Sequence, residues 1–516
     1  MPELATAIPY QHLFNQFWLS LLFIIPIVLV ARAVVAGTRY SAILIIVVFG
    51  LVMGYLLVAT GVSTPGLADF PMLGMIAQAT IIALAASFFV GGQELRRILT
   101  GTRISPDDSV VYATEQMFFG TGRTQVFFIL RSFFMLLGIA ALTPMILGTV
   151  PDNALGRYYP LIAYMGLVIA VILIDHKATI SDKKLYLRKG LVEILAIIVV
   201  LLLGFQLVLW VRPTIALPQI FFVMLLASSL GALLYRWVHG PAVRCLLFAG
   251  IPVVLAANFV MGGSRILEAL ALPGMNAVLL YGFFGQLWWM FGGIALLMLF
   301  GQTAAVRNLG PGMAGSLSHA GLTGACTAGD LGNTAAKRAP IMINIPFFGH
   351  IFVFSILAIS VEQGGLLLLP ALLIVAVGVA LTALSLRNLS RADGQDEPEV
   401  KALMQFSFGW QLSAVFGGLL LLALSPMSIE HALMAKSSSI SHFGLFAALQ
   451  GGMAGAAAAE MIAFVFAMPF LVHPLVFFMF GRAMESGENM PRIPVYALAL
   501  IGIIGVIVSL LVAGNS

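Results

Sequence analysis

Charged side chains are scarce in this chain, which has 516 residues of which only 9% are Asp, Glu, Lys or Arg. A soluble globular domain carries about 25% charged residues, so this scarcity excludes a soluble enzyme, a disordered segment and a nucleic-acid-binding domain. Cysteine is also scarce: Cys245 and Cys326 lie in or beside apolar segments, which excludes a disulfide framework and a cysteine metal site. The chain is 61% hydrophobic, and we predict an all-α polytopic protein embedded in the lipid bilayer.

Long apolar runs recur along the whole chain, and each run of about 20 residues is a candidate transmembrane helix. The segment 443–481 is too long for one span, because as a single helix it would measure about 58 Å against a hydrocarbon core of about 30 Å. We therefore expect it to break at Gly451–Gly452, Gly455, Pro469 or Pro474. We expect about 14 transmembrane helices in all, at 13–36, 40–61, 70–92, 126–149, 157–175, 190–211, 218–237, 242–262, 276–301, 339–361, 365–386, 404–425, within 443–481, and 493–513.

Lys and Arg are distributed unevenly among the predicted loops. No basic residue precedes Arg32, so the first apolar run lacks the positive n-region of a cleaved signal peptide. The loops after spans 3, 5, 7, 9 and 11 are rich in Lys and Arg, and basic residues concentrate in cytoplasmic loops. We predict a multi-pass protein of the inner cell membrane with both termini outside the cytoplasm.

Similar segments recur at an offset of about 200–215 residues. For example, FFVGGQELRRI at 88–98 is similar to LMLFGQTAAVRN at 297–308. We interpret the chain as a first repeat of about six helices (1–215), a second repeat (216–428) and an appended C-terminal segment (429–516). Internal repeats are typical of secondary transporters, whose substrate sites lie at the repeat interface. Whether the repeats are parallel or inverted stays open here, and the bilayer alone also makes helix–loop–helix units look alike.

No catalytic motif is visible, because the chain contains no Walker sequence, no CxxC pair and no HExxH. No polar stretch is long enough for a nucleotide-binding domain. We therefore expect no enzymatic activity and no cofactor. The energy for transport would come from a Na⁺ or H⁺ gradient, from the gradient of the substrate itself, or from a separate subunit.

The most unusual segment is the Gly-rich stretch 302–338. Glycine lets backbone groups approach a ligand closely, and irregular backbone is tolerated at membrane depth where it lines a cavity. A flexible cytoplasmic loop is the alternative interpretation. The candidate site residues of this stretch are Asp330, Asn333 and Thr334, as oxygen ligands for Na⁺ or as a carrier of H⁺, and Ser318 and His319, as contacts to a polar substrate.

Polar residues inside the predicted spans are further candidates, because burying a charge in the bilayer is costly. Glu460 lies among small residues that permit close helix contact, although a position at the membrane interface is equally compatible with the pattern. The neutral candidates are Asn258, Gln286 and Asn344. We interpret the other deep polar residues, including Gln411, His350 and His473, as hydrogen-bonding groups between helices, and we expect Glu193 to reach water.

The place in the first repeat that matches the Gly-rich stretch holds Gln93 and Glu94. Farther on, GTGRTQ precedes a predicted span, and its Arg123 together with backbone amides is suited to bind an anion at a helix N-terminus. Alternatively, Arg123 is one of the basic residues that keep a loop on the cytoplasmic side of the membrane. From this segment we slightly favour an anionic substrate over a neutral one.

Two segments near the N-terminus resemble ion-coupled secondary carriers of the sodium/glutamate symporter and cation/proton antiporter type. They are AILIIVVFGLVMGYLLVATG at 42–61 and IAQATIIALAASFFVGGQELRRI at 76–98. Those families similarly show a Gly-rich second helix and then an apolar helix that ends in Gly and an acidic–Leu–basic element. The resemblance implies ion-coupled transport. It carries over no functional residues, because the adjacent-aspartate and Gly-rich core signatures of those families are absent.

A plan of about 14 spans with an outside N-terminus also resembles the antiporter-like subunits of respiratory complexes. Those subunits place lysines in the middle of several helices, whereas all seven lysines here, Lys436 among them, fall in predicted loops.

A membrane-embedded glycan or lipid-handling enzyme or flippase is a second alternative. The largest predicted outside loop, 426–442, has few side chains that could bind a phosphate-linked substrate, which disfavours this alternative. A non-transporting subunit of a larger complex is the third alternative.

We predict from these features a secondary active transporter that works by alternating access. Its substrate would be a small polar or anionic molecule, and its coupling ion Na⁺ or H⁺. No nucleic acid is expected as a partner, and assembly into a homo-oligomer stays open.

Overall fold

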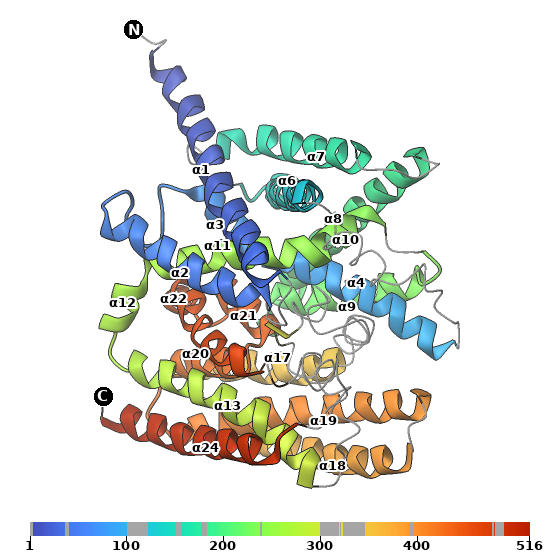
Figure 1. Cartoon of the computed structure of the whole chain (residues 1–516), viewed down its shortest axis with the longest axis vertical. Helices are drawn as coiled ribbons and strands as arrows, with labels where there is room; N and C mark the ends of the chain where they lie inside the picture. Colours follow the sequence, from blue (N-terminus) through green and yellow to red (C-terminus); the bar gives the residue numbers. More distant parts are fainter. Residues whose placement is uncertain are drawn as a thin grey trace.

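The chain folds as a bundle of helices (Figure 1). The structure, a computed structural model, describes residues 4–36, 41–100, 122–150, 156–176, 183–237, 240–299, 319, 321–322, 346–392, 396–476, 479 and 490–515. Within these ranges the secondary structure is helical, and the one isolated β-bridge joins His319 to His442. The prediction of an all-α protein is confirmed for this part of the chain.

Twelve helices of the described part are long and apolar enough to cross a membrane, as the sequence predicts for a multi-pass protein. They span Gln16–Val35, Ala42–Ala59, Pro71–Arg97, Gln125–Leu147, Gly156–Ile174, Leu187–Val211, Pro241–Ser264, Met275–Leu299, Leu368–Leu389, Lys401–Ala423, Ala456–Val476 and Arg492–Gly514. The predicted spans at 218–237 and 339–361 contain two shorter apolar helices, Gln219–Leu233 and Phe352–Glu362.

Large apolar side chains cover much of the protein surface. Leu22, Leu369 and Ile493 are each more than half exposed, as are many other leucines and isoleucines on the long helices. A soluble monomer rarely exposes apolar patches of this extent, whereas in lipid the helix satisfies its own backbone groups and presents apolar side chains outward. The surface therefore fits an integral membrane protein.

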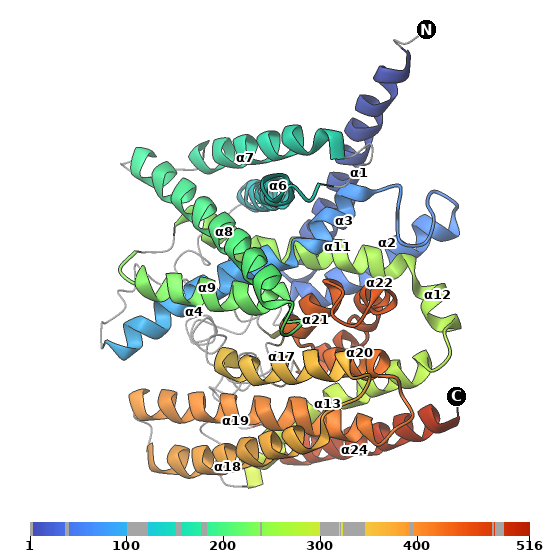
Figure 2. The same cartoon turned by 180° about the vertical axis from the view of Figure 1, so that it is seen from behind.

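The helices of the N-terminal half form one end of the molecule and part of its centre, with α1, α6 and α7 outermost (Figures 1 and 2). They are α1 (Leu4–Val35), α2 (Ala42–Ala59), α3 (Pro71–Gln78), α4 (Thr80–Leu99), α6 (Gly122–Leu147), α7 (Tyr159–His176), α8 (Lys183–Val211), α9 (Gln219–Leu233), α10 (Pro241–Cys245), α11 (Ile251–Ser264) and α12 (Ile266–Ala271).

The C-terminal half contributes a layer of four long helices, α13, α18, α19 and α24, at the opposite end (Figures 1 and 2). The short helices α20, α21 and α22 lie between this layer and the α2–α11 pair. The bounds are α13 (Met275–Leu299), α17 (Pro346–Glu362), α18 (Leu368–Ala392), α19 (Asp396–Ala423), α20 (Ile429–Ser439), α21 (Phe443–Gln450), α22 (Ala456–Val465), a 3₁₀ turn at Met468–Val472, and α24 (Arg492–Asn515).

The predicted break within 443–481 is confirmed. Helix α21 ends at Gln450, and α22 begins only at Ala456. Between them Gly452 and Gly455 have φ angles of +87° and +93°, a conformation that glycine adopts without steric cost. The break lets two short helices replace one helix that would be too long for the bilayer.

Close helix pairs depend on glycines at the contacts. On α2 and α11, a Cβ added at Gly50 would lie 2.7 Å from the Phe259 Cβ. On α6 and α7, a Cβ at Gly138 would lie 2.7 Å from the Leu167 backbone nitrogen. Small residues that let helix backbones approach in this way are typical of membrane helix interfaces.

Candidate functional site

Helix α20 ends inside the protein, and the chain turns sharply before α21 begins. The turn contains Ser441, whose φ of +46° is rare for a residue other than glycine. The next residue, His442, caps α21, because its Nδ1 accepts a hydrogen bond from the Leu445 backbone N–H at 2.9 Å. All residues from Lys436 to His442 are buried. Residues 432–442 are therefore not part of an exposed outside loop, which the sequence predicts over 426–442.

A second segment reaches the same point from far away in the sequence. His319 forms an antiparallel β-bridge with His442. Its Nδ1 accepts a hydrogen bond from the Leu322 backbone N–H at 3.1 Å, the same spacing of three residues as in the cap of α21. His319, one of the sequence candidates, thus lies in a fully buried contact with the turn between α20 and α21.

We call the contact between His319 and His442 the histidine crossing. Four buried histidines meet there as two pairs. The rings of His319 and His473 are 4.9 Å apart, centre to centre. The rings of His350 and His442 are 5.0 Å apart. All four side chains have no exposed surface. The sequence interpretation of His350 and His473 as simple links between helices did not anticipate that the fold brings them together with His319 and His442.

Each histidine pair also contacts a buried glutamine. The Gln286 amide, on α13, lies 2.7 Å from the His319 Nε2. The Gln411 amide, on α19, lies 3.2 Å from the His350 Nδ1. Gln286 was a candidate from the sequence, and the structure places it at this crossing.

Lys436 corrects the expectation that every lysine lies in a loop, because its side chain is fully buried on α20. Its Nζ lies 4.1 Å from the centre of the Trp289 ring. Within the described residues this Nζ has no hydrogen-bond acceptor and no carboxylate partner. A buried charge without a counterion is costly, and such a residue in a membrane protein marks a functional site by default.

The crossing is rich in buried hydrogen-bond donors. In the described part of the chain, the hydroxyls of Ser437 and Ser441 and the Nε2 of His442 have no hydrogen-bond partner. Together with the Lys436 amino group they are buried groups that are able to donate hydrogen bonds. No group of three or more His, Cys, Asp and Glu side chains suited to a metal ion occurs among the described residues.

The repeated pattern Ser-x-Ser-His-x-Gly-Leu, at 316–322 and 439–445, is the sequence signal that could have found this site. Two histidines in the same unusual context, 123 residues apart, indicate equivalent roles. Single-residue reasoning could not detect this, because each histidine alone resembles an ordinary buried polar residue.

Asn258 lies at a different hydrogen-bonded junction, where α11 meets the break between α3 and α4. Its Nδ2 donates to the Ala77 carbonyl and contacts the Thr80 hydroxyl, each at 3.0 Å. Its Oδ1 accepts from the Gln450 Nε2, on α21, at 2.6 Å. Asn258 therefore links three segments that are distant in sequence, and its described hydrogen bonds are all within the protein.

We expect Asn258→Leu to lower the free energy of unfolding by about 1–3 kcal/mol, because it removes the buried hydrogen bonds that Asn258 makes with the Ala77 carbonyl, the Thr80 hydroxyl and the Gln450 amide. The Gln450→Leu variant should cost a similar amount, and the double variant should cost clearly less than the sum. Thermal unfolding of the four detergent-solubilised proteins tests this cycle. Additive losses would show that the two residues do not interact.

The remaining candidates with described side chains lie apart from the crossing. Gln93 donates through Nε2 to the carbonyls of Leu234 and Trp237, at 3.3 and 2.7 Å, and so holds α4 against the end of α9. The backbone of Glu94 lies on the same helix. Arg123 is exposed in the first turn of α6.

Glu460 lies at the protein surface in the middle of α22. Its Oε2 is 3.0 Å from the Arg265 Nη1, and its side chain is 51% exposed. Arg265 also pairs with Glu268 at 2.9 Å. An exposed ion pair of this kind contributes about 0–1 kcal/mol to stability, and the proposed role of Glu460 in ion binding stays a prediction.

Glu193 corrects another expectation, because it is buried rather than in contact with water. Its carboxylate accepts hydrogen bonds from the backbone N–H groups of Gly240, Ala242 and Val243 at the start of α10. It therefore caps that helix in place of an N-cap side chain.

Five of the candidate residues lie outside the part of the chain that the structure describes. They are Asp330, Asn333, Thr334, Ser318 and Asn344.

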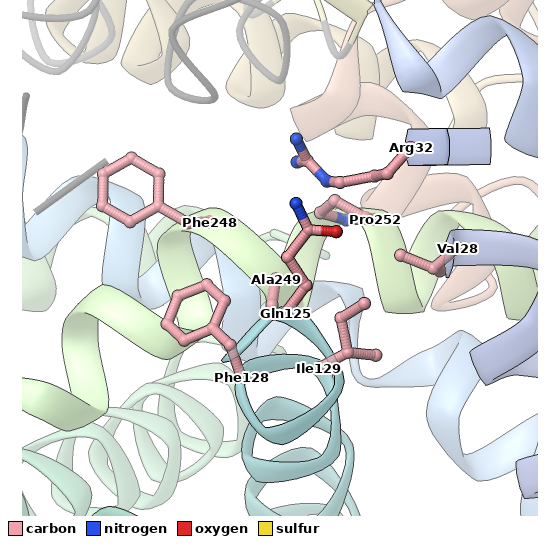
Figure 3. Close-up of a pocket in the computed structure, with 8 residues that line it drawn as sticks. All are labelled: Val28, Arg32, Gln125, Phe128, Ile129, Phe248, Ala249 and Pro252. Carbon is pink, nitrogen blue, oxygen red and sulfur yellow. The ribbon is translucent and has the colours of Figure 1, made fainter. Parts of the chain in front are cut away.

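A small pocket lies between α1, α6 and the start of α11, and Figure 3 shows its lining residues. Two of them are polar, Arg32 from α1 and Gln125 from α6, and the other six are apolar. None of the candidate site residues lines it. We therefore take the histidine crossing, and not this pocket, as the candidate functional site.

No protein-family model, no curated protein and no solved structure matches this chain.

Proposed function

We propose that this protein is a secondary active transporter that moves a small polar or anionic solute across the membrane by alternating access about the histidine crossing. The observation that carries the proposal is the antiparallel contact of His319 with the buried turn at His442, where α20 gives way to α21, inside a protein built of membrane-spanning helices. Interrupted helices whose ends meet in the membrane interior are how secondary transporters form substrate and ion sites.

The buried polar groups of the crossing support the same function. Irregular backbone at membrane depth is tolerated where it is buried in protein or lines a cavity. Donors without partners, such as the Lys436 Nζ and the Ser441 hydroxyl, lose hydrogen bonds on burial unless a ligand replaces them. A solute that binds there would restore these hydrogen bonds. No covalent step is part of the proposal.

Uptake into proteoliposomes tests the proposed function directly. Pools of labelled metabolites are offered with an imposed Na⁺ or H⁺ gradient that is switched on and off. We expect accumulation only when the correct gradient is present. In addition, Asp330→Asn or Glu460→Gln should abolish accumulation if either residue holds the coupling ion, while Glu362→Gln, an exposed carboxylate at the end of α17, serves as the matched control.

Accumulation that survives collapse of both gradients would contradict ion coupling. Intact, monodisperse protein that accumulates no pool under any gradient would contradict transport altogether. The enzyme and complex-subunit alternatives would then gain support.

A further inference from the structure

Three sequence patterns occur twice in the C-terminal half, in the same order. Each second copy follows the first by 123 to 125 residues. Duplication of one unit explains why three patterns share nearly one offset, and this offset differs from that of the six-helix repeat predicted in the sequence analysis. The patterns are Gln-Leu-x-x-x-Phe-Gly-Gly at 286–293 and 411–418, Ser-x-Ser-His-x-Gly-Leu at 316–322 and 439–445, and Pro-Phe-x-x-His at 346–350 and 469–473.

The four histidines of these patterns pair between the two copies. His319, from the first copy, faces His473, from the second. The equivalent residues do the same, because His442, from the second copy, faces His350, from the first. Each pair therefore contains one histidine from each copy, as expected for two units that are related by a two-fold axis.

The long helices pack with the same symmetry. Helix α13 packs along α24, and α19 packs along α18. A Cβ added at Gly378, on α18, would lie 2.7 Å from the Ser413 backbone nitrogen on α19. At the equivalent positions, a Cβ added at Gly502 would collide with the Trp288 backbone nitrogen. The first long helix of each copy thus packs on the last helix of the other copy.

The two copies run in opposite directions. The bridge between the equivalent residues His319 and His442 is antiparallel, which a two-fold axis through the bridge requires. In Figure 1, α13 starts beside α12 at one side of the molecule, whereas α19 starts at the other side after its hairpin with α18. Repeats of opposite orientation are an architecture from which alternating access is built.

The two copies differ in one hydrogen bond at the histidine crossing. In the first copy, the Gln286 amide lies 2.7 Å from the His319 Nε2. The equivalent bond in the second copy would join Gln411 to His442, and it is absent from the described structure. There, the His442 Nε2 and the Gln411 Oε1 both have no hydrogen-bond partner. The Gln411 amide instead lies 3.2 Å from the His350 Nδ1.

Exchanging the conformations of the two copies gives a second arrangement of these groups. In it Gln286 would contact His473, and Gln411 would contact His442. Each glutamine would move only to the other ring of the histidine pair that it already touches, and the ring centres within the pairs are 4.9 and 5.0 Å apart. Both arrangements give each glutamine one histidine partner, which favours two interconverting states of similar population.

The unsatisfied groups of the second copy fit this second arrangement. The His442 Nδ1 accepts the Leu445 backbone N–H, so the neutral ring carries its hydrogen on Nε2. That Nε2–H is a donor without an acceptor in the described part of the chain, and the Gln411 Oε1 is an acceptor without a donor. Contact between the two would satisfy both, whereas a buried polar group without a partner is exceptional in a native structure.

We propose that 275–392 and 396–515 are inverted repeats, and that Gln286 and Gln411 switch the protein between two states by changing histidine partners. In the state described here, Gln286 contacts the histidine of its own repeat, and Gln411 contacts that of the other repeat. In the second state these assignments are reversed. Because the repeats have opposite orientations, a path to the crossing that opens from one face of the membrane in the first state opens from the other face in the second. The role of the switch in transport rests on the proposed function.

Labelling from each face of the membrane tests the inversion. Leu299, at the end of α13, and Leu424, just after α19, are equivalent positions and are 71% and 82% exposed. The background carries Cys245→Ala and Cys326→Ala, so that each added cysteine is the only one in the chain. We expect Leu299→Cys and Leu424→Cys to react with a membrane-impermeant maleimide from opposite faces. Reaction of both from the same face would overturn the inverted repeat.

Two matched substitutions test the switch. His319→Asn weakens only the state described here, because the His319 imidazole contacts a glutamine amide only in that state. His442→Asn weakens only the second state, for the equivalent reason. Asparagine keeps an acceptor for the backbone N–H at both positions, so we expect both variants to fold, and their apparent melting temperatures check this.

The reporter of the two states is Ser437→Cys in the same cysteine-free background. Ser437 is fully buried on α20 beside the crossing, so an impermeant thiol reagent reaches it only when the crossing opens. The readout is the ratio of its labelling rates from the two faces. We expect His319→Asn and His442→Asn to shift this ratio in opposite directions, each by about two- to tenfold for the loss of one buried hydrogen bond.

Variants that weaken both states equally are the matched controls. Gln286→Leu removes one contact from each state, because Gln286 has a histidine partner in both. The double variant His319→Asn/His442→Asn also removes one contact from each state. We expect both controls to keep the parental ratio of labelling rates.

The other two histidines give an independent pair of variants. His350 contacts Gln411 only in the state described here, so His350→Phe should shift the ratio in the same direction as His319→Asn. His473 would contact a glutamine only in the second state, so His473→Phe should shift the ratio in the same direction as His442→Asn.

Three results would overturn the switch. They are an unchanged ratio in both single asparagine variants, shifts of the two in the same direction, and a double variant that does not return to the parental ratio. Opposite shifts in a protein that accumulates no solute under any gradient would contradict transport and retain the switch. Solute uptake together with a parental ratio in both single variants would contradict the switch and retain transport.

Discussion

A leucine in place of Gly263 is expected to reduce the amount of correctly folded protein more than any other single change considered for this chain. Gly263 lies on α11 against the backbone of α2, where an added Cβ would collide with the Leu51 carbonyl oxygen and lie 2.8 Å from the Leu51 Cα. Backbone atoms cannot rotate away as a side chain can. The two helices must therefore separate, and α11 is the most completely buried candidate span of the described part.

The expected cost is about 3 kcal/mol or more, at the upper end for overpacked cores. A membrane protein of ordinary marginal stability would then extract mainly as aggregate. The measurement is the monodisperse fraction after detergent extraction, together with the apparent melting temperature. Gly74→Leu is the matched control, because nothing lies within 4 Å of a Cβ at Gly74 and removing a helical glycine is mildly favourable. Equal behaviour of the two variants would contradict close α2–α11 packing.

The helices themselves follow from the sequence alone. Apolar runs of about 20 residues have one stable conformation in lipid, since only a helix satisfies its own backbone there. The break at Gly452 and Gly455 also follows, because a helix of that length does not fit the bilayer. These are local properties, which a sequence displays directly.

The burial of Lys436 does not follow from the sequence in the same way. The serines and the histidine around Lys436 lower the local hydropathy, so the segment 426–442 resembles a loop. The fold buries it because α20 ends at a crossing with a segment more than 100 residues away, at His319. Nothing near Lys436 in the sequence indicates that contact.

The histidine pairs illustrate the same limit. Gln286 and His319 were recognised as candidates singly, but His473, which faces His319, and His350, which faces His442, were assigned to ordinary helix contacts. What joins them is tertiary contact between segments that are far apart in the sequence. The recurrence of Ser-x-Ser-His-x-Gly-Leu at 316–322 and 439–445 is found by comparing the chain with itself, and not by scoring residues one at a time.

Replacing His442 separates its two roles, as a helix cap and as a member of the crossing. His442→Ala removes the Nδ1 acceptor of the Leu445 N–H, which should cost about 1 kcal/mol of stability as the loss of an N-cap. His442→Asn keeps an acceptor at the cap, because asparagine is among the preferred N-cap residues, but it removes the imidazole that faces His350.

We therefore expect His442→Asn to retain nearly the parental melting temperature, whereas His442→Ala melts about 1 °C lower. Uptake should fall in both variants to less than about a tenth of the parental rate, because the lost imidazole contacts are worth at least about 1.4 kcal/mol in the transport cycle. Matched substitutions at His319 should give the same pattern, since the Nδ1 of each histidine accepts a hydrogen bond from the backbone N–H three residues farther along the chain. Parental uptake in His442→Asn would show that the imidazole only caps a helix, and the crossing would then be a structural junction.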